Sequence, residues 1–123
     1  NNIVNIWGNG KPKREFLFVD DLAESCYKVL KLSKKKYFNL VNHNNQFLNV
    51  GYGKDISIKD LSILIKRMTK FNGKIFFDKK MPNGTNKKLL DSRKIKKIGW
   101  KPKTSLEDGL NITYKWFKEN FDV

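Results

Sequence analysis

Residues Trp7 to Asp21, WGNGKPKREFLFVDD, decide how this chain folds and what it can bind. An Asn-Gly pair followed by Lys-Pro is typical of a tight turn. We therefore expect Trp7 and Arg14 to lie on either side of one loop and to face the same ligand. An indole offers a flat surface to a base or sugar, and a guanidinium offers paired donors to phosphate, so the stretch indicates a nucleotide-like anion. A core role for Trp7 and a surface ion pair for Arg14 would also explain these residues.

Strands and helices are predicted to alternate along the chain. Runs of apolar and β-branched residues predict strands at 3–7, 16–19, 47–50 and 74–78. A helix is expected to begin at Asp20 or Asp21, to close at the lysines 34–36, and to lead into a polar loop over 37–46. Further helices are expected after cap residues at Ser57, at Asp91-Ser92 and at Thr104-Ser105. The fold class is therefore mixed α/β.

Several conspicuous side chains are better explained by packing or solvent than by chemistry. Cys26 falls on the apolar face of the first predicted helix. Trp100 lies in the linker before the last predicted helix, and Trp116 lies within that helix beside its apolar stripe, which consists of Leu106, Leu110, Tyr114 and Phe117. Cys26, Trp100 and Trp116 are therefore expected in the core. His43 lies in the asparagine-rich loop and is expected to be solvated. The glycines of Gly51-Tyr52-Gly53 lack the third glycine and the following helix of a dinucleotide fingerprint, so they predict a turn.

Composition limits the class of protein and its partners. A chain of 123 residues with 39% hydrophobic and 13% aromatic residues is long enough for one small globular domain. The formal net charge of +14 would suit nucleic acid or an anionic membrane. The basic residues, however, are mostly dispersed lysines, with arginine only at 14, 67 and 93, whereas specific readers of bases rely on arginine. A compositional bias is favoured, and a small basic module that binds nucleic acid remains an alternative.

The single cysteine and the absence of a long apolar run indicate the cellular compartment of the protein. Cys26 has no partner for an internal disulfide, and no Cys/His grouping has metal-ligand spacing, so we expect a reducing, cytoplasmic compartment and no metal. No run is long enough to cross a membrane, and the first residues lack the pattern of a signal peptide. Because the chain opens directly on a strand-like segment, we expect it to be part of a longer protein.

Four segments carry a resemblance to a known family. They are WGNGKPKREFLFVDDLAE, FLNVGYGKDISIKDLSILI, FDKKMPNGTNKKLLDSRKIKKIGWKP and TSLEDGLNITYKWFKEN. Together they resemble the C-terminal part of the GDP-L-fucose synthases, which are NADP-dependent extended short-chain dehydrogenases. The VDDLA, NVG and SI segments are common to many nucleotide-sugar epimerases and dehydratases, while the WGNGKPKREF and PNGTNKKLLD segments are closer to the fucose synthase pattern.

The resemblance implies a small mixed α/β substrate-binding domain over residues 1–123, without the Rossmann half of the enzyme. Residues 14–53 are expected to pack back toward that missing half, which would bind NADP, and the parent enzyme is expected to be a homodimer. The implied reaction is the NADPH-dependent epimerisation and reduction of GDP-4-keto-6-deoxy-D-mannose to GDP-L-fucose. A part of another nucleotide-sugar epimerase or dehydratase is the alternative.

The resemblance also assigns candidate site residues. Trp7 and Arg14 match family residues that contact the nucleotide sugar, and Lys88 matches a lysine on the diphosphate side. Asn83 stands where the family usually has an aspartate, so that contact keeps an acceptor and loses a charge. The family's catalytic residues lie upstream, so no catalytic residue is predicted in this chain.

Two pairs of residues match the Tyr-x-x-x-Lys spacing of the family's catalytic pair. These are Tyr27 with Lys31 and Tyr114 with Lys118. Both fall in predicted helices that packing explains, without a serine partner or a cofactor fingerprint, so we interpret them as coincidental.

Overall fold

The computed structural model describes residues 2–121 and divides the chain into two compact units, which we treat separately. Unit 1 comprises Asn1–Arg14, Asp55–Lys88 and Glu107–Val123. Unit 2 comprises Glu15–Lys54 and Leu89–Leu106. Within the described residues the structure is mixed α/β, as predicted, with five helices and two small sheets.

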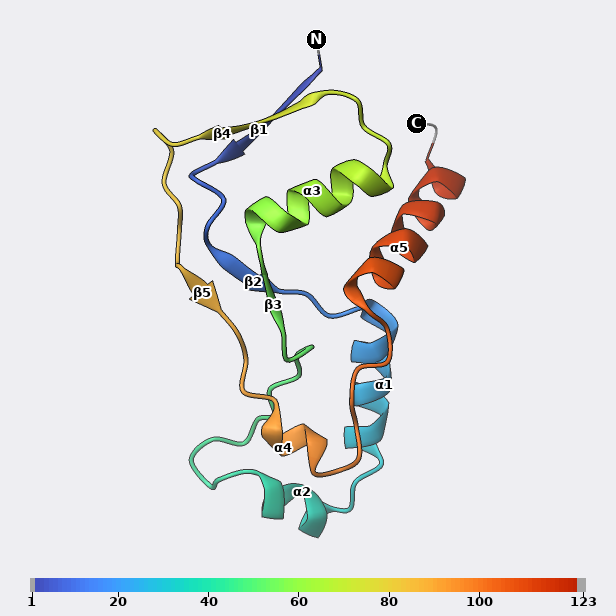
Figure 1. Cartoon of the computed structure of the whole chain (residues 1–123). Coiled ribbons are helices and arrows are strands. Elements are labelled where there is room, and N and C mark those ends of the chain that lie inside the picture. Colours follow the sequence, from blue (N-terminus) through green and yellow to red (C-terminus); the bar gives the residue numbers. More distant parts are fainter. Residues whose placement is uncertain (1, 122–123) are drawn as a thin grey trace. The chain divides into compact units, whose positions relative to one another are not determined.

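Unit 1 contains both sheets and two helices. Its elements are β1 (Ile3–Trp7), β2 (Lys13–Glu15, of which the first two residues belong to unit 1), β3 (Asp55–Ser57), α3 (Ile58–Met68), β4 (Lys74–Asp78), β5 (Lys87–Lys88) and α5 (Leu106–Asn120, from its second residue onward). Strands β1 and β4 pair in parallel, and α3 runs alongside them (Figure 1). The second sheet has the order β3-β2-β5, with β2 and β5 parallel.

Local signals account for several elements of unit 1. β1 and β4 coincide with the predicted strands at 3–7 and 74–78. Helix α3 begins after the predicted cap, because Ser57 Oγ accepts a hydrogen bond from Asp60 N at 3.0 Å. Asp60 reaches back to this cap, although its Oδ2 accepts from the Ser57 hydroxyl rather than from the Ser57 backbone.

The second predicted strand is shifted. The structure has β2 at Lys13–Glu15, and Phe18 is already the N-cap of a helix, so there is no strand at 16–19. Lys13 N donates to Asn86 O at 2.8 Å, which anchors the earlier residues to β5. Hydrogen bonding to a neighbouring strand therefore decides the position of β2, and the apolar run after it does not.

Unit 2 consists of helices and irregular chain. Its helices are α1 (Val19–Leu30), α2 (Lys34–Leu40) and α4 (Arg93–Lys96). The prediction of one helix closing at 34–36 and a loop over 37–46 is wrong for residues 34–40, because Ser33 Oγ accepts from Lys36 N and begins α2. The predicted strand at 47–50 is also wrong, because those residues form no ladder.

The core of unit 2 is small and partly polar. Ile95 and Trp100 are essentially fully buried, at 0% and 1% exposure, which confirms the core assignment of Trp100. Asp21 is buried beside them: its Oδ2 accepts from the backbone N–H groups of Lys103 at 3.1 Å and Thr104 at 2.9 Å. Asp21 therefore anchors the segment after Trp100 and does not cap α1, whose N-cap has no side-chain hydrogen bond.

Two other core assignments are wrong. Cys26 is exposed, as are the neighbouring Leu22 and Leu30 on the apolar face of α1. Trp116 in α5 is 55% exposed. In both helices part of the apolar stripe predicted from the sequence is left exposed.

Candidate functional site

All four candidate binding residues belong to unit 1, where two turns meet. One turn follows β1 and contains Gly8 and Asn9, and the other follows β4 and contains Asn83. Asn9 N donates to Asn83 Oδ1 at 2.7 Å. Gly8 has a φ of +82°, and a Cβ on it would overlap Asn83 Oδ1, so glycine is required both for the backbone conformation and for the close approach.

Arg14 is held by backbone carbonyl groups beside the same turns. Its Nη1 donates to Thr85 O at 2.8 Å and to Lys13 O at 2.7 Å. A Cβ placed on Gly84, whose φ is +70°, would lie 3.5 Å from Arg14 Nη2. One end of the guanidinium is thus anchored to the turn while Nη2 keeps donors for a ligand, which is the arrangement that forked recognition of phosphate needs.

The β3-β2-β5 sheet carries two pairs of cations with different surroundings. Lys13 is the partner of Lys87 across β2 and β5, and Arg14 is the partner of Lys88. Since side chains alternate along a strand, the two pairs lie on opposite faces. On the first face Asp55 balances the charge, with Lys87 Nζ 3.4 Å from Oδ2 and Lys13 Nζ 4.0 Å from Oδ1.

The other face is left positively charged. Neither Arg14 nor Lys88 forms an ion pair with any residue that the structure describes. Like charges directly opposite each other destabilise a sheet. An anionic ligand that bridges the two side chains would remove this repulsion, so this face is the candidate anion site.

Trp7 completes the set at the end of β1. It is paired with Asp78 in the parallel ladder, and Gly8 N donates to Asp78 O at 2.8 Å, so the glycine turn starts directly beside the indole. Trp7 is 67% exposed, so the described part of this chain does not bury it. An exposed indole can stack on a base or sugar.

Sequence reasoning missed the residues that hold this site together. Asn9 and Thr85 contribute backbone groups, which leave no trace in residue type, and Asp55 forms its ion pairs only because β3 joins the sheet. The Asn9 side chain offered one usable signal. Its Oδ1 accepts from Lys11 N at 2.9 Å, which is the local Asx turn that an Asn-Gly pair favours.

The two Tyr-x-x-x-Lys matches have a packing explanation. Lys31 Nζ lies 4.3 Å from the centre of the Tyr27 ring, and Lys118 Nζ lies 4.8 Å from the centre of the Tyr114 ring. In each case the ammonium group sits over the ring face, which is a cation–π contact between neighbours on a helix. His43 is exposed in a turn, as predicted for a solvated loop.

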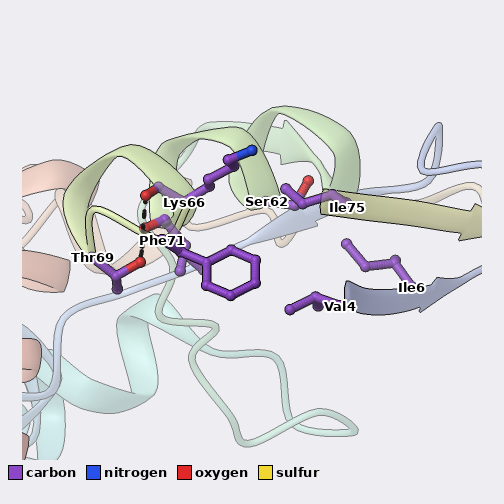
Figure 2. A pocket seen from close by; sticks show the side chains of 8 residues that line it. Val4, Ile6, Ser62, Lys66, Thr69, Phe71 and Ile75 are labelled. Atoms are coloured by element: carbon purple, nitrogen blue, oxygen red, sulfur yellow. Dashed lines mark hydrogen bonds between the residues drawn. The ribbon is translucent and has the colours of Figure 1, made fainter. Parts of the chain in front are cut away.

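A cavity of about 340 Å³ lies elsewhere in unit 1, between α3 and the β1–β4 pair (Figure 2). Figure 2 shows Val4, Ile6 and Phe71 turned into it. Its polar groups already have partners, because Thr69 Oγ1 donates to Ile65 O at 2.9 Å and Lys66 Nζ donates to Gly73 O at 2.7 Å. The cavity is therefore incomplete packing between a helix and a sheet and offers no reactive group.

Among residues 2–121 there is no group of three or more His, Cys, Asp or Glu side chains placed to hold a metal ion. None of the helices in the described part of the chain has the length and apolar character needed to cross a membrane.

Comparison with known proteins assigns the family. The family model described as GDP-mannose 4,6 dehydratase matches residues 1–113. The chain belongs to this family. Membership confirms the predicted relation to the extended short-chain dehydrogenases that act on nucleotide sugars.

Individual relatives agree with this assignment. A putative GDP-L-fucose synthase 2 from Arabidopsis thaliana is 44% identical over 95% of this chain and 33% of its own length. A GDP-L-fucose synthase from Escherichia coli K12 is 40% identical over 97% of this chain and 37% of its own length. Among solved structures, a GDP-mannoheptose C4 reductase from Campylobacter jejuni with NADP bound is 37% identical, with a TM-score of 0.77 over 94% of this chain and 35% of the reductase. The chain therefore spans about a third of the length of the relatives it matches.

Proposed function

We propose that this chain is the substrate-binding part of a GDP-L-fucose synthase. The whole enzyme would convert GDP-4-keto-6-deoxy-D-mannose to GDP-L-fucose by epimerisation and reduction. The observation that carries the proposal is the pair formed by Arg14 and Lys88, which has no carboxylate partner among the described residues and stands beside a glycine turn. A nucleoside diphosphate supplies the missing negative charge. The identity to GDP-L-fucose synthases favours the GDP-sugar over other nucleotide sugars.

Each candidate residue has a role that its chemistry supports. Arg14 and Lys88 would hold the diphosphate, and the exposed indole of Trp7 would stack on the base or sugar. Asn83 would complete the substrate contacts from the second turn. NADPH would supply the hydride in the whole enzyme, and we propose that an N-terminal Rossmann half binds it. No catalytic residue is proposed here, so the chain alone should be inactive.

The proposed contact with the N-terminal Rossmann half rests on an exposed apolar surface of unit 2. In unit 2 the apolar side of α1 faces outward, with Val19 65% exposed and Leu30 84% exposed. An apolar stripe on an amphipathic helix is normally covered by protein. We propose that residues 14–53 pack through this surface against the cofactor-binding half. A homodimeric parent and a cytoplasmic location remain predictions from the resemblance and from the single cysteine.

The test is an NMR titration of the 123-residue chain with GDP, with UDP in a parallel sample. Signals of the Trp7 indole N–H, the Arg14 Nε–H and the Lys88 backbone amide should shift together with GDP, and UDP should need a higher concentration. Equal responses to GDP and UDP would favour another nucleotide-sugar enzyme. A well-dispersed spectrum that responds to neither, but responds to an oligonucleotide with a steep loss of affinity in salt, would replace the proposal with nucleic-acid binding.

A further inference from the structure

We infer that Asn83 contacts a phosphoryl oxygen of the ligand through its amide Nδ2 donors, instead of accepting a hydrogen bond from a sugar hydroxyl. This inference rests on the proposed function, since it concerns the same site. The inference goes beyond the proposed function because the resemblance leaves open whether the residue at position 83, where the family usually has an aspartate, still contacts the sugar.

The first step is that one lone pair of the Asn83 oxygen accepts a hydrogen bond from the first turn, and the close packing of Gly8 on the same atom leaves little room for a second donor. Asn9 N lies 2.7 Å from Asn83 Oδ1, and a backbone N–H can only donate, so the oxygen of the amide and not its nitrogen must face the first turn. Flipping the amide would set its Nδ2 donors against the Asn9 N–H donor, so this hydrogen bond fixes the orientation. The remaining polar atom of the side chain is Nδ2, which carries two N–H donors.

The second step is that the neighbouring groups are donors too. Arg14 keeps Nη2 beside Gly84, and Lys88 presents an ammonium group that can only donate. The acceptor on the Asn9 side chain is occupied by Lys11 N. A ligand group that meets Arg14, Lys88 and Asn83 together must therefore offer acceptor oxygens, and a diphosphate does so on every side.

An aspartate at position 83 would behave differently. Its first oxygen could accept from Asn9 N as the amide oxygen does, so the two turns would stay joined. Its second oxygen would be an acceptor with negative charge, suited to a sugar hydroxyl and repelled by phosphate. The asparagine in this chain thus changes the polarity of the position without changing its shape.

The experiment compares Asn83→Asp with the unaltered chain and with Asn72→Asp as a charge control. Asn72 is exposed, belongs to the same unit and forms no side-chain hydrogen bond with any residue that the structure describes, so Asn72→Asp adds the same charge away from the site. Binding of GDP is measured by calorimetry and by NMR. We expect Asn83→Asp to leave the Asn9 amide signal near its position and to weaken GDP binding about tenfold more than the control does. In the unaltered chain the Asn83 side-chain NH₂ signals should shift with GDP.

The outcomes separate this inference from the proposed function. If Arg14 and Lys88 respond to GDP while the Asn83 NH₂ signals stay still and Asn83→Asp binds as the control does, the inference is overturned and the proposed function stands. If none of the three residues responds, no anion site exists and both are overturned.

Discussion

Replacing Gly8 by alanine tests the meeting of the two turns, because this residue combines a left-handed backbone with a close contact. Its φ is +82°, where an alanine costs about 1–2 kcal/mol relative to glycine. The new methyl group would overlap Asn83 Oδ1 and lie 3.0 Å from Asn83 Cα, and crowding of this kind costs about 1–3 kcal/mol. Loss of the Asn9–Asn83 hydrogen bond adds about 1 kcal/mol.

These contributions predict that Gly8→Ala lowers the free energy of unfolding by roughly 3–6 kcal/mol, a large share of the stability of a small domain. Urea denaturation followed by circular dichroism measures the change. GDP binding should weaken as well, since the second turn would be displaced from Arg14. Where the variant unfolds too readily for titration, the Asn9 and Asn83 amide signals report the separation of the turns directly.

Two other glycines provide matched controls. Gly84 in the same unit has a φ of +70°, and its nearest neighbour would be Arg14 Nη2 at an ordinary contact distance of 3.5 Å. Gly99 has a φ of +75° with no atom within 4 Å of an added Cβ. Alanine at either position should cost only the backbone term of about 1–2 kcal/mol. If Gly8→Ala shifts the unfolding curve no more than these two do, the close packing of the turns is refuted.

Three further predictions concern carboxylates. Asp21→Ala leaves two backbone N–H groups in unit 2 without their buried acceptor, so it should lower the free energy of unfolding in urea by roughly 2–4 kcal/mol. Asp21→Asn should lower it less, because an amide oxygen remains as an acceptor. The pKa of Asp91 is lowered from 3.8 to about 2, mainly by the side-chain hydrogen bond from Arg93. The stabilisation by Asp91 should therefore be complete above pH 3.8 and be lost as the pH falls from there through about 2. NMR titration should show the Asp91 pKa rising toward 3.8 in Arg93→Gln. Asp55→Asn removes the charge that balances the lysine pair of the sheet, so stability should fall at low salt and recover in part at high salt, and an effect independent of salt would contradict the ion pairing.

Local patterns were sufficient where an element depends on its own residues. β1, β4 and α3 follow from apolar spacing and from the Ser57 cap, and the turn after α4 follows from Gly99. The tight turn around Asn9 was equally readable, since the Asn-Gly pair and its Asx hydrogen bond are local. Such elements can be predicted because no distant residue is needed to form them.

Elements that depend on distant partners were missed. β3 and β5 have three and two residues, too few for an apolar period, and exist because β2 pairs with both. Helix α2 is a local exception: the three lysines of its first turn are typical of a helix C-terminus, so they predict the end of the preceding helix, whereas the Ser33 cap begins a new one. The apolar stripes of α1 and α5 were identified correctly, but burial requires a partner surface that the sequence alone does not supply.

The distribution of the acidic residues says more about the ligand than the net charge does. A surplus of +14 would suit any polyanion, and dispersed lysines by themselves point to none. In the β3-β2-β5 sheet, however, one cation pair is balanced by a carboxylate on β3 and the pair on the opposite face is not. On the uncompensated face the Arg14 guanidinium is fixed by the carbonyl groups of Lys13 and Thr85 and lies beside Gly84, and the same unit carries the exposed indole of Trp7. Those features match a compact diphosphate with a base attached better than an extended nucleic-acid backbone, which would need a continuous row of such cations.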